Sequence, residues 1–273
     1  MEYKRFLTIQ DISCVGQCSM TVAMPILSAW GHETCILPTA VLSTHTGGFG
    51  TPTILRFGDS LEDIWRHWQK NDISFDAILV GYLGSISAIR TTMDIMENLL
   101  APGGISIVDP VMADNGKLYS GFDLAYAEEM KTLCCRADVI LPNVTEASLL
   151  SGVPYQAVMT EDYVNSILKG LDHSCVILTG VGYEADQTGV VLYRQGRGTH
   201  YPQRRLGGSF HGTGDMFAAS FTGALMSGKT MENSVKIAAK FTENAIQNTI
   251  DNPSHWYGVK FEPLLSQIKQ MRV

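Results

Sequence analysis

The sequence has little charge and no long apolar run, which argues against several classes of protein. Charged residues make up 17% of the 273 residues, and the formal net charge is −7. An acidic balance disfavours binding to nucleic acid or to an anionic membrane surface. No apolar run is long enough to span a bilayer, and we expect no secretory leader before the first strand-like segment. We therefore expect a cytoplasmic protein that binds neither nucleic acid nor membrane.

Cysteine is too sparse and too scattered for a disulfide scaffold. The chain contains six cysteines, none of them in C-x-x-C spacing. The adjacent pair Cys134 and Cys135 cannot easily share one zinc site. We expect reduced thiols at all six positions, which are Cys14, Cys18, Cys35, Cys134, Cys135 and Cys175.

Linker-like sequence is also absent. The chain has no run rich in Pro or Ser, no block of like charges and no low-complexity tract. Apolar residues make up 45% of the composition, which is enough to bury a sizeable core. We expect a single domain over residues 1–273.

Short apolar segments alternate with helix-like segments along most of the chain. We expect strands at 6–10, 34–39, 40–43, 77–80, 105–108, 139–141 and 175–178, and a hairpin joining 190–193 to 198–202. We expect helices at 16–30, 61–70, 87–100, 124–133, 162–171 and 216–226, and further helix towards the C-terminus. This alternation predicts an α/β fold, with a mostly parallel central β-sheet covered by helices on both faces.

Polar residues recur where the expected strands end. Asp11, Tyr82, Asp109, Asn143 and Thr179 each follow an apolar strand segment. In open parallel sheets, ligands bind outside the carboxyl ends of the strands. We therefore expect these side chains, scattered in sequence, to converge on one edge of the sheet.

A glycine-rich stretch at 207–214 leads directly into the helix expected at 216–226. Gly212 and Gly214 can adopt positive φ and let a ligand approach the backbone. The unpaired amides and the dipole of a helix N-terminus favour an anion there. Asp215 adds a carboxylate, which we expect the dipole to keep ionised. Such a pair suits phosphoryl transfer to a hydroxyl, although Asp215 could instead be a structural helix cap.

Residues 223–230 read Gly-Ala-Leu-Met-Ser-Gly-Lys-Thr and match the P-loop pattern letter for letter. A true P-loop follows a strand and opens a helix, so that its amides face phosphate. Here Gly223 lies inside an expected helix, and Gly228 is placed to end that helix. We interpret the match as a coincidence.

Taken together, six short motifs resemble the pyridoxal kinase group of the ribokinase-like superfamily, from Phe6 to about Gln247. Their order along the chain is more specific than any one of them. Hydroxymethylpyrimidine kinases are a close alternative, but their Gly-Gly-Ala-Gly stretch after the first strand is replaced here by residues 14–18. The motifs are Thr8-Ile-Gln10, Leu42-Ser-Thr-His-Thr-Gly47, Gly81-Tyr82, Asp109-Pro-Val-Met112, Pro142-Asn-Val-Thr-Glu146 and Gly212-Thr-Gly-Asp215.

The resemblance implies an ATP-dependent kinase that phosphorylates the 5′-hydroxyl of pyridoxal, pyridoxine or pyridoxamine. Asp215 would be the general base, and the amides of Gly212, Thr213 and Gly214 the anion hole. Asp109 and Glu146 would organise Mg²⁺ through water. The resemblance also implies a homodimer and allows a monovalent cation such as K⁺.

The remaining implied residues divide between the two substrates. On the nucleotide side, Asn143, Thr179 and Gly180 would line the phosphates, and Asp114 and Tyr119 would belong to a flap over the nucleotide. Gly180 stands where a hydroxyl residue is often found, so this side has one donor fewer. The residues implied around the pyridine ring are Asp11, His45, Thr46 and Tyr82.

Asp11 stands where many family members have Ser. An ionised Asp only accepts hydrogen bonds and stabilises a neighbouring cation, so it would favour a protonated ring. Alternatively, Asp11 caps the helix that follows Gly16.

Purely structural roles are also open to several of these residues. Residues 143–146 fit the pattern of a helix cap. Asp109 could simply end a strand, and His45 could be a polar residue in a turn. A non-catalytic B6-vitamer binding protein is a further hypothesis for the function. The presence of Asp109, Glu146 and Asp215 argues against it, because a pure binder needs none of them.

Overall fold

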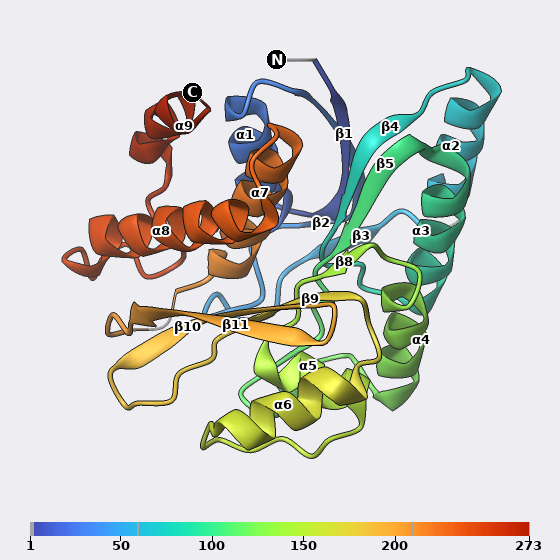
Figure 1. The fold of residues 1–273 in the computed structure, drawn as a ribbon. Helices are drawn as coiled ribbons and strands as arrows, with labels where there is room; N and C mark the ends of the chain where they lie inside the picture. The colour runs from blue at the N-terminus through green and yellow to red at the C-terminus, as the bar shows by residue number, and fades with distance from the viewer. Residues whose placement is uncertain (1–2, 59, 209, 273) are drawn as a thin grey trace.

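A mostly parallel sheet runs through the protein, as the alternating pattern predicts (Figure 1). The computed structural model describes residues 3–58, 60–208 and 210–272, so Ser209 of the glycine-rich stretch lies outside the described residues. These residues form a nine-stranded sheet with the order β11-β10-β9-β8-β5-β4-β1-β2-β3. Its strands are β1 Arg5–Ser13, β2 Glu33–Leu42, β3 Ile54–Arg56, β4 Phe75–Val80, β5 Leu100–Val108, β8 Val139–Ile140, β9 Cys175–Thr179, β10 Gln187–Arg194 and β11 Arg197–Arg204.

Parallel pairing joins β2, β1, β4, β5, β8 and β9, whereas β3, β10 and β11 pair antiparallel with their neighbours. The hairpin of β10 and β11, which is expected from sequence, turns at Gln195 and Gly196, and both residues have positive φ. A separate small hairpin pairs β6, Ala113–Asp114, with β7, Lys117–Leu118.

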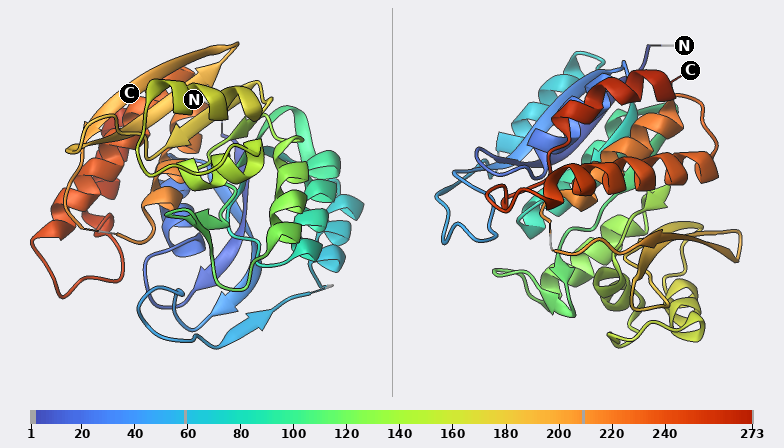
Figure 2. Two further views of the ribbon diagram at one scale, coloured as in Figure 1. Left: turned by 90° about the horizontal axis from the view of Figure 1, so that it is seen from below. Right: turned by 90° about the vertical axis from the view of Figure 1, so that its left-hand side faces the viewer.

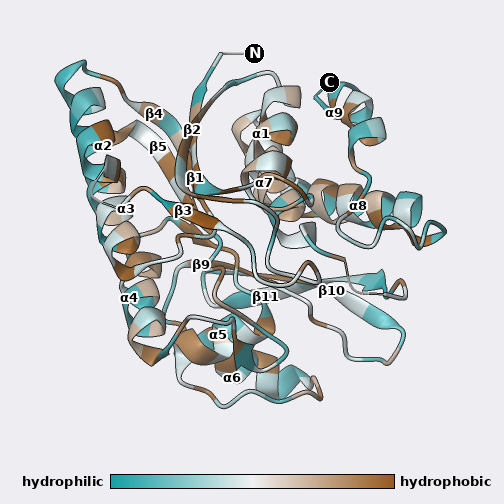
Figure 3. Cartoon of the chain, turned by 180° about the vertical axis from the view of Figure 1, so that it is seen from behind, coloured by the Kyte–Doolittle hydropathy of each residue, from teal (hydrophilic) through white to brown (hydrophobic). Residues whose placement is uncertain are grey.

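Helices cover both faces of the sheet and enclose two apolar cores (Figures 1 and 2). One core lies under α1, α7, α8 and α9, and the other under α2 to α6. Helix α2 buries Leu61 and Trp65, while its outer surface is hydrophilic (Figure 3). The helices are α1 Met20–Ala29, α2 Ser60–Lys70, α3 Ile86–Leu99, α4 Leu124–Cys134, α5 Val144–Ser151, α6 Glu161–Gly170, α7 Thr213–Met226, α8 Met231–Ile250 and α9 Leu265–Met271.

The segment between β1 and α1 differs from the sequence expectation. Asp11 was expected to end the first strand, but β1 continues to Ser13. The helix expected from Gly16 begins only at Met20. Gly16 and Ser19 both have positive φ, which is incompatible with a right-handed helix, so the four residues before Met20 form a tight loop.

Sequence patterns also missed β3, α5 and the two short strands β6 and β7. The edge strand β3 has only three residues, too few for a periodic signal. Helix α5 was read only as a possible cap, although the cap and its helix are both present.

The crevice for a ligand is set by the order of the strands. From β1 the chain moves to β2 on one side, whereas from β4 it moves to β5 on the other, and β1 and β4 are direct neighbours. Such a switch point opens a crevice at the carboxyl ends of the two strands. Asp11 lies near the end of β1, and Tyr82 follows β4, so both flank this crevice.

The P-loop match is a coincidence, as its sequence context indicates. Gly223 is in the interior of α7, and Gly228 with φ of 87° follows the C-cap residue Ser227. Lys229 therefore lies beyond the carbonyl end of a helix, which repels phosphate.

Among the described residues, no helix combines the length and apolar character needed to cross a membrane.

Candidate active site

The glycine-rich loop reaches α7 at Gly212, which is its N-cap residue with φ of 78°. A Cβ at Gly212 would lie only 2.1 Å from the carbonyl oxygen of Gln17, so any side chain would have to displace backbone. None of the described side chains caps this helix N-terminus. The first-turn amides, including those of Thr213 and Gly214, are therefore left for a ligand, and the helix dipole favours an anion there.

Asp215 sits in the first turn of α7 and is 9% exposed. Its Oδ2 accepts a hydrogen bond from the backbone amide of Ser19 at 2.8 Å and one from the Cys18 thiol at 3.4 Å. Burial raises the pKa of Asp215, while these hydrogen bonds lower it. The sequence expectation considered only the dipole, which favours the ionised form, and did not include this opposing effect of burial.

A second carboxylate, Asp109, follows β5 and faces the same loop. A Cβ at Gly214 would lie 3.7 Å from Asp109 Oδ2. Burial raises the pKa of Asp109 well above its usual range, and the charges of Glu146 and Asp215 raise it further. None of the described residues donates a hydrogen bond to the Asp109 carboxylate. Buried negative charge of this density is unfavourable unless a cation is bound beside it.

Glu146 holds backbone segments together through both of its carboxylate oxygens. Its Oε2 accepts a hydrogen bond from the amide of Asn143 at 2.9 Å, and its Oε1 accepts one from the amide of Met112 at 3.1 Å. The Asn143 side chain caps the Glu146 amide at 3.0 Å, which completes a capping box at the start of α5. The helix-cap interpretation is therefore correct for this pair. Burial raises the pKa of Glu146 to about 8.

These residues fit a hydrated Mg²⁺ ion better than an ion enclosed by protein ligands. In the described part of the chain, no three His, Cys, Asp or Glu side chains are grouped to hold a metal. Mg²⁺ keeps several waters and usually shares one or two carboxylates with substrate phosphates. The carboxylate that fits this description is Asp109, because the Glu146 oxygens are already engaged by backbone amides.

The expected flap residues lie on or just after the β6–β7 hairpin. Asp114 is exposed and accepts a hydrogen bond from the amide of Asn115 at 2.8 Å. Tyr119 is 40% exposed, and its amide donates to the carbonyl of Met112. The Asn143 side chain donates to the carbonyl of Ala113 at 2.8 Å, which ties the hairpin to α5.

Thr179 and Gly180 lie beside the start of α5. Thr179 forms a parallel bridge with Asn143, and its amide donates to the carbonyl of Pro142 at 2.9 Å. Gly180 is exposed with φ of 78°, a conformation that suits glycine. The two residues thus share one edge of the sheet with Asn143, as expected.

On the other side of the crevice, Asp11 is 3% exposed and accepts a hydrogen bond from the Ser13 hydroxyl at 3.0 Å. Burial raises the pKa of Asp11 to about 6, with a contribution from the negative charge of Asp215. Helix α1 starts after Ser19 with no side-chain cap hydrogen bond, so the interpretation in which Asp11 caps this helix is wrong.

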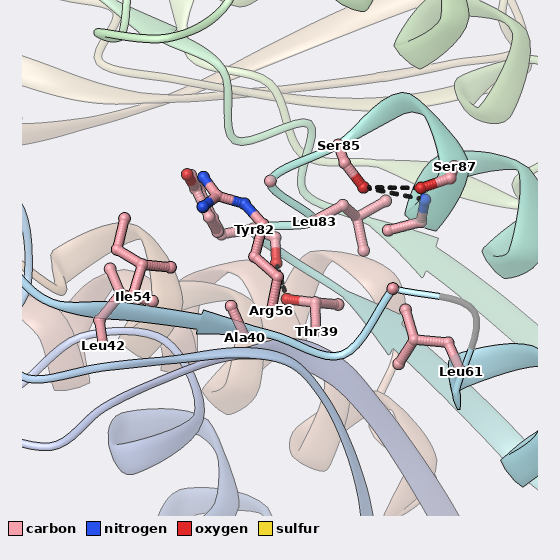
Figure 4. Close-up of a pocket in the computed structure, with 13 residues that line it drawn as sticks. Thr39, Ala40, Leu42, Ile54, Arg56, Leu61, Tyr82, Leu83, Ser85 and Ser87 are labelled. Atoms are coloured by element: carbon pink, nitrogen blue, oxygen red, sulfur yellow. Dashed lines mark hydrogen bonds between the residues drawn. The ribbon is translucent and has the colours of Figure 1, made fainter.

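Tyr82 is half-buried, and the charge of Asp11 raises its pKa in addition to burial. Its ring lies 5.5 Å from that of Phe122, measured between centroids. Thr39 donates a hydrogen bond to the Tyr82 carbonyl at 3.1 Å. A cavity of about 120 Å³ opens beside Tyr82 (Figure 4). It is lined by residues of β2 and β3, by residues 82–84 and by the start of α3.

His45 is buried, and both of its ring nitrogens are engaged. Nδ1 accepts a hydrogen bond from the amide of Gly47 at 3.0 Å, which leaves Nε2 to donate to the carbonyl of Tyr257 at 2.9 Å. Its contacts are thus those of a polar turn residue, the structural role that the sequence also allows. The neighbouring Thr46 is exposed.

Sequence reasoning missed several residues of the site. Cys18 and Ser19 contact Asp215, although the sequence around them carries no recognisable signal. The ring of His211 lies 4.5 Å from that of His45, and Trp256 packs against Phe49 at 4.6 Å. The only hint in the sequence was the adjacency of His211 to Gly212.

The chain matches the sequence profile of the phosphomethylpyrimidine kinase family over residues 64–259. It is similar to a solved pyridoxal kinase of Lactobacillus plantarum, with 34% identity over 99% of this chain and 98% of that chain and a TM-score of 0.92. It is also similar to a Bacteroides thetaiotaomicron protein that was described as a phosphomethylpyrimidine kinase and solved with pyridoxal, with 35% identity over 98% and 96% of the two chains and a TM-score of 0.92.

A pyridoxal kinase of Arabidopsis thaliana is 25% identical over 91% of this chain and 83% of its own length. The profile match and the similarity along nearly whole chains agree with the ribokinase-like arrangement of the sheet and its helices. The protein belongs to the phosphomethylpyrimidine kinase family, and it has the ribokinase-like fold of the pyridoxal kinases that it resembles.

Proposed function

We propose that the protein is an ATP-dependent kinase that phosphorylates the 5′-hydroxyl of pyridoxal, pyridoxine and pyridoxamine. The observation that carries this proposal is the position of Asp215, a buried carboxylate in the first turn of a helix whose N-terminal amides are left for an anion. The crevice beside it is flanked by Asp11 and Tyr82, which suit a polar aromatic ring. Pyridoxal kinase relatives that match nearly the whole chain support the same substrate class.

In the proposed reaction, Asp215 accepts the proton of the 5′-hydroxyl as the hydroxyl oxygen attacks the γ-phosphorus of ATP. The bond from this phosphorus to the β,γ-bridging oxygen breaks, and ADP leaves. The amides of Gly212, Thr213 and Gly214 stabilise the negative charge on the transferring phosphoryl oxygens. The Ser19 amide and the Cys18 thiol both donate hydrogen bonds to Asp215 Oδ2, so Oδ1 is the oxygen left for the hydroxyl.

Mg²⁺ belongs to this proposal because the carboxylates beside the phosphate loop need a countercharge. Asp109 would hold the ion through water, and Glu146 would support the site by holding the backbone of Met112 and Asn143. When bound, Mg²⁺ neutralises phosphate charge. Asn143, Thr179 and Gly180 would line the phosphate side, while Asp114 and Tyr119 would cover the nucleotide from the β6–β7 hairpin and the residue just after it.

On the acceptor side, we place the pyridine ring between Asp11 and Tyr82, with Thr46 near its polar substituents. His45 supports the turn that carries Thr46, because its ring accepts a hydrogen bond from the Gly47 amide and donates one to the Tyr257 carbonyl. The remaining parts of the proposal rest on the family resemblance for the homodimer and the cation, and on the composition of the sequence for the location and the single domain. They are a homodimer, a cytoplasmic location, one kinase domain over residues 1–273 and the use of a monovalent cation such as K⁺.

A second candidate function is the phosphorylation of hydroxymethylpyrimidine. The observation that favours it is the match to a family named for phosphomethylpyrimidine kinases. Its substrate also presents a hydroxymethyl group on a flat heteroaromatic ring. Both substrates would therefore use the same general base and the same anion loop.

One assay separates these functions. ADP formation is measured with ATP and Mg²⁺ and with pyridoxal, pyridoxine, pyridoxamine or the aminopyrimidine, and Asp215→Asn serves as the inactive control. We expect ADP formation with at least one vitamer at a higher kcat/KM than with the aminopyrimidine. Turnover of the aminopyrimidine alone would support the second candidate. Vitamer binding without any ADP formation would support the non-catalytic hypothesis and overturn both kinase functions.

A further inference from the structure

We propose that Cys18 and Ser19 form a positioning corner that orients Asp215 for proton transfer. Here the positioning corner means the thiol of Cys18 and the backbone amide of Ser19, which both donate to one oxygen of the general base. The inference rests on the proposed function, because it assigns a role to residues that act through Asp215.

The two donors converge on Oδ2 of Asp215. The amide of Ser19 lies 2.8 Å from this oxygen, and the Cys18 sulfur lies 3.4 Å from it. The carboxylate is buried, so rotation about its terminal bond would break both contacts without replacement by bulk water. The second oxygen, Oδ1, is thereby directed to the substrate hydroxyl.

The backbone of the positioning corner is held in an uncommon conformation. Ser19 has φ of 53° and ψ of −125°, a combination that is unfavourable for a residue other than glycine. Such strain persists only where the surrounding structure imposes it, and it is concentrated at functional sites. Here it directs the Ser19 amide at Asp215, 196 residues away in sequence.

Contacts on both sides keep the positioning corner in place. The Ser19 carbonyl accepts the amides of Val22 and Ala23 at 3.0 and 2.9 Å, which fixes it to the first turn of α1. The Thr21 hydroxyl donates to the Cys18 carbonyl at 2.9 Å. Ser19 also forms a bridge with Ile12 of β1. The donors are therefore oriented before any substrate arrives.

A neutral thiol suits this task. Burial raises the pKa of Cys18 well above its ordinary value, and the carboxylates of Asp215 and Asp11 raise it further. Cys18 therefore stays protonated as an S–H donor and is not a nucleophile. A cationic donor at this place would stabilise the ionised carboxylate strongly and reduce its basicity. A weak neutral donor orients the carboxylate with little loss of basicity.

The test is a double-mutant cycle with Cys18→Ala, Asp215→Asn and the two combined, measured as kcat and KM with the best vitamer. We expect Cys18→Ala to lower kcat by about 3- to 10-fold, the loss of about one hydrogen bond, with little change in either KM. In the Asp215→Asn background, the same change should have no further effect. Cys18→Ser, which keeps a donor, should restore kcat to within about twofold of wild type.

Cys14→Ala is the matched control, because Cys14 belongs to the same segment but its side chain is exposed. It should leave kcat unchanged. If Cys18→Ala lowers Tm by more than about 5 °C, the isosteric pair Cys18→Thr and Cys18→Val replaces it, one with a donor and one without. The proposal then requires Cys18→Thr to be the faster of the two.

Three results would overturn the positioning role. They are a folded Cys18→Ala within twofold of wild-type kcat, an equal loss of kcat in both Asp215 backgrounds, and equal rates for the donor and non-donor variants. Failure of the kinase assignment itself is a separate result. It would appear as no ADP formation by the wild-type protein with any of the substrates, before any variant is compared.

Discussion

Asp215 and Ser19 are joined by a hydrogen bond of 2.8 Å from the Ser19 amide to the Asp215 carboxylate, across 196 residues of sequence. The bond connects the residue before α1 to the first turn of α7. These two helices also pack against each other in one core. Asp215, the proposed general base, is therefore held in place jointly by the first and last thirds of the chain.

Asp215→Asn should retain the fold and lose turnover. An amide cannot accept the hydroxyl proton, so we expect kcat to fall by roughly 10²- to 10⁴-fold, with little change in KM for ATP. Steady-state kinetics, with thermal unfolding as the check on folding, test this. A variant within threefold of wild type would remove Asp215 from the mechanism.

Lys229→Ala should leave both turnover and ATP affinity nearly unchanged. Lys229 lies beyond the C-terminus of α7, where carbonyl groups rather than amides face outward, so no phosphate is expected beside it. The measurements are kcat and KM for ATP. A large rise in KM for ATP would place the nucleotide at the P-loop match instead of at Gly212.

Asp11→Asn should stabilise the protein at high pH and not at low pH. Burial raises the pKa of Asp11 from 3.8 to about 6, so the folded state binds this proton more tightly than the unfolded chain. Asp11 therefore lowers stability progressively as pH rises through this window, and the full effect is reached above about pH 6. We expect the variant to unfold with a free energy up to about 3 kcal/mol higher than wild type at pH 8.

The check is urea unfolding of wild type and Asp11→Asn at pH 8 and at pH 4. Comparing the two proteins at each pH cancels the titration of all other groups. If the two proteins differ in free energy of unfolding by the same amount at pH 8 and at pH 4, the charge of Asp11 is not the cause of the difference.

Ser19→Gly should raise stability while activity is retained. Glycine adopts the φ and ψ of Ser19 without strain, and the amide that donates to Asp215 is kept. Relief of strain is of order 1–3 kcal/mol, and the greater entropy of glycine in the unfolded chain offsets about 1 kcal/mol. We therefore expect a net gain of about 1 kcal/mol in the free energy of unfolding.

Ser19→Ala is the control for Ser19→Gly, because it removes the same hydroxyl but keeps the Cβ and hence the strain. It should show no gain in denaturant unfolding. If the alanine variant is as stable as the glycine variant, backbone strain at Ser19 is not the reason.

Much of the fold follows from local patterns. The segment 77–80 is an unbroken apolar run and lies in β4, and the segment 61–70 has helical periodicity and lies in α2. The expected ends of helices and strands were less accurate where one residue has an unusual backbone conformation. No composition rule indicates that Ser19 adopts a positive φ, so the start of α1 was placed four residues too early.

Sequence was sufficient to predict the position of a residue in the fold where that residue follows a strand or opens a helix. The positions of Asp109 and Asn143 were predicted in this way because parallel strands bring their carboxyl ends to one edge, and that of Asp215 because it follows the glycines that open α7. Sequence was insufficient to identify the groups that form hydrogen bonds with the site residues. The role of Glu146 towards Mg²⁺ stays a prediction, but sequence did not indicate that its oxygens accept hydrogen bonds from the backbone amides of Met112 and Asn143, because such contacts depend on the folding of a distant loop.

By itself, the sequence determined the alternation of strands and helices, the bare glycine backbone at Gly212 and the carboxylate that follows it. These features are local, because they depend on periodicity and on single residue types. Only the tertiary structure decided that Cys18 and Ser19 reach Asp215, and that burial raises the pKa values of Asp11 and Asp109. Burial and hydrogen-bond partners depend on segments that meet in space, and no local pattern contains that information.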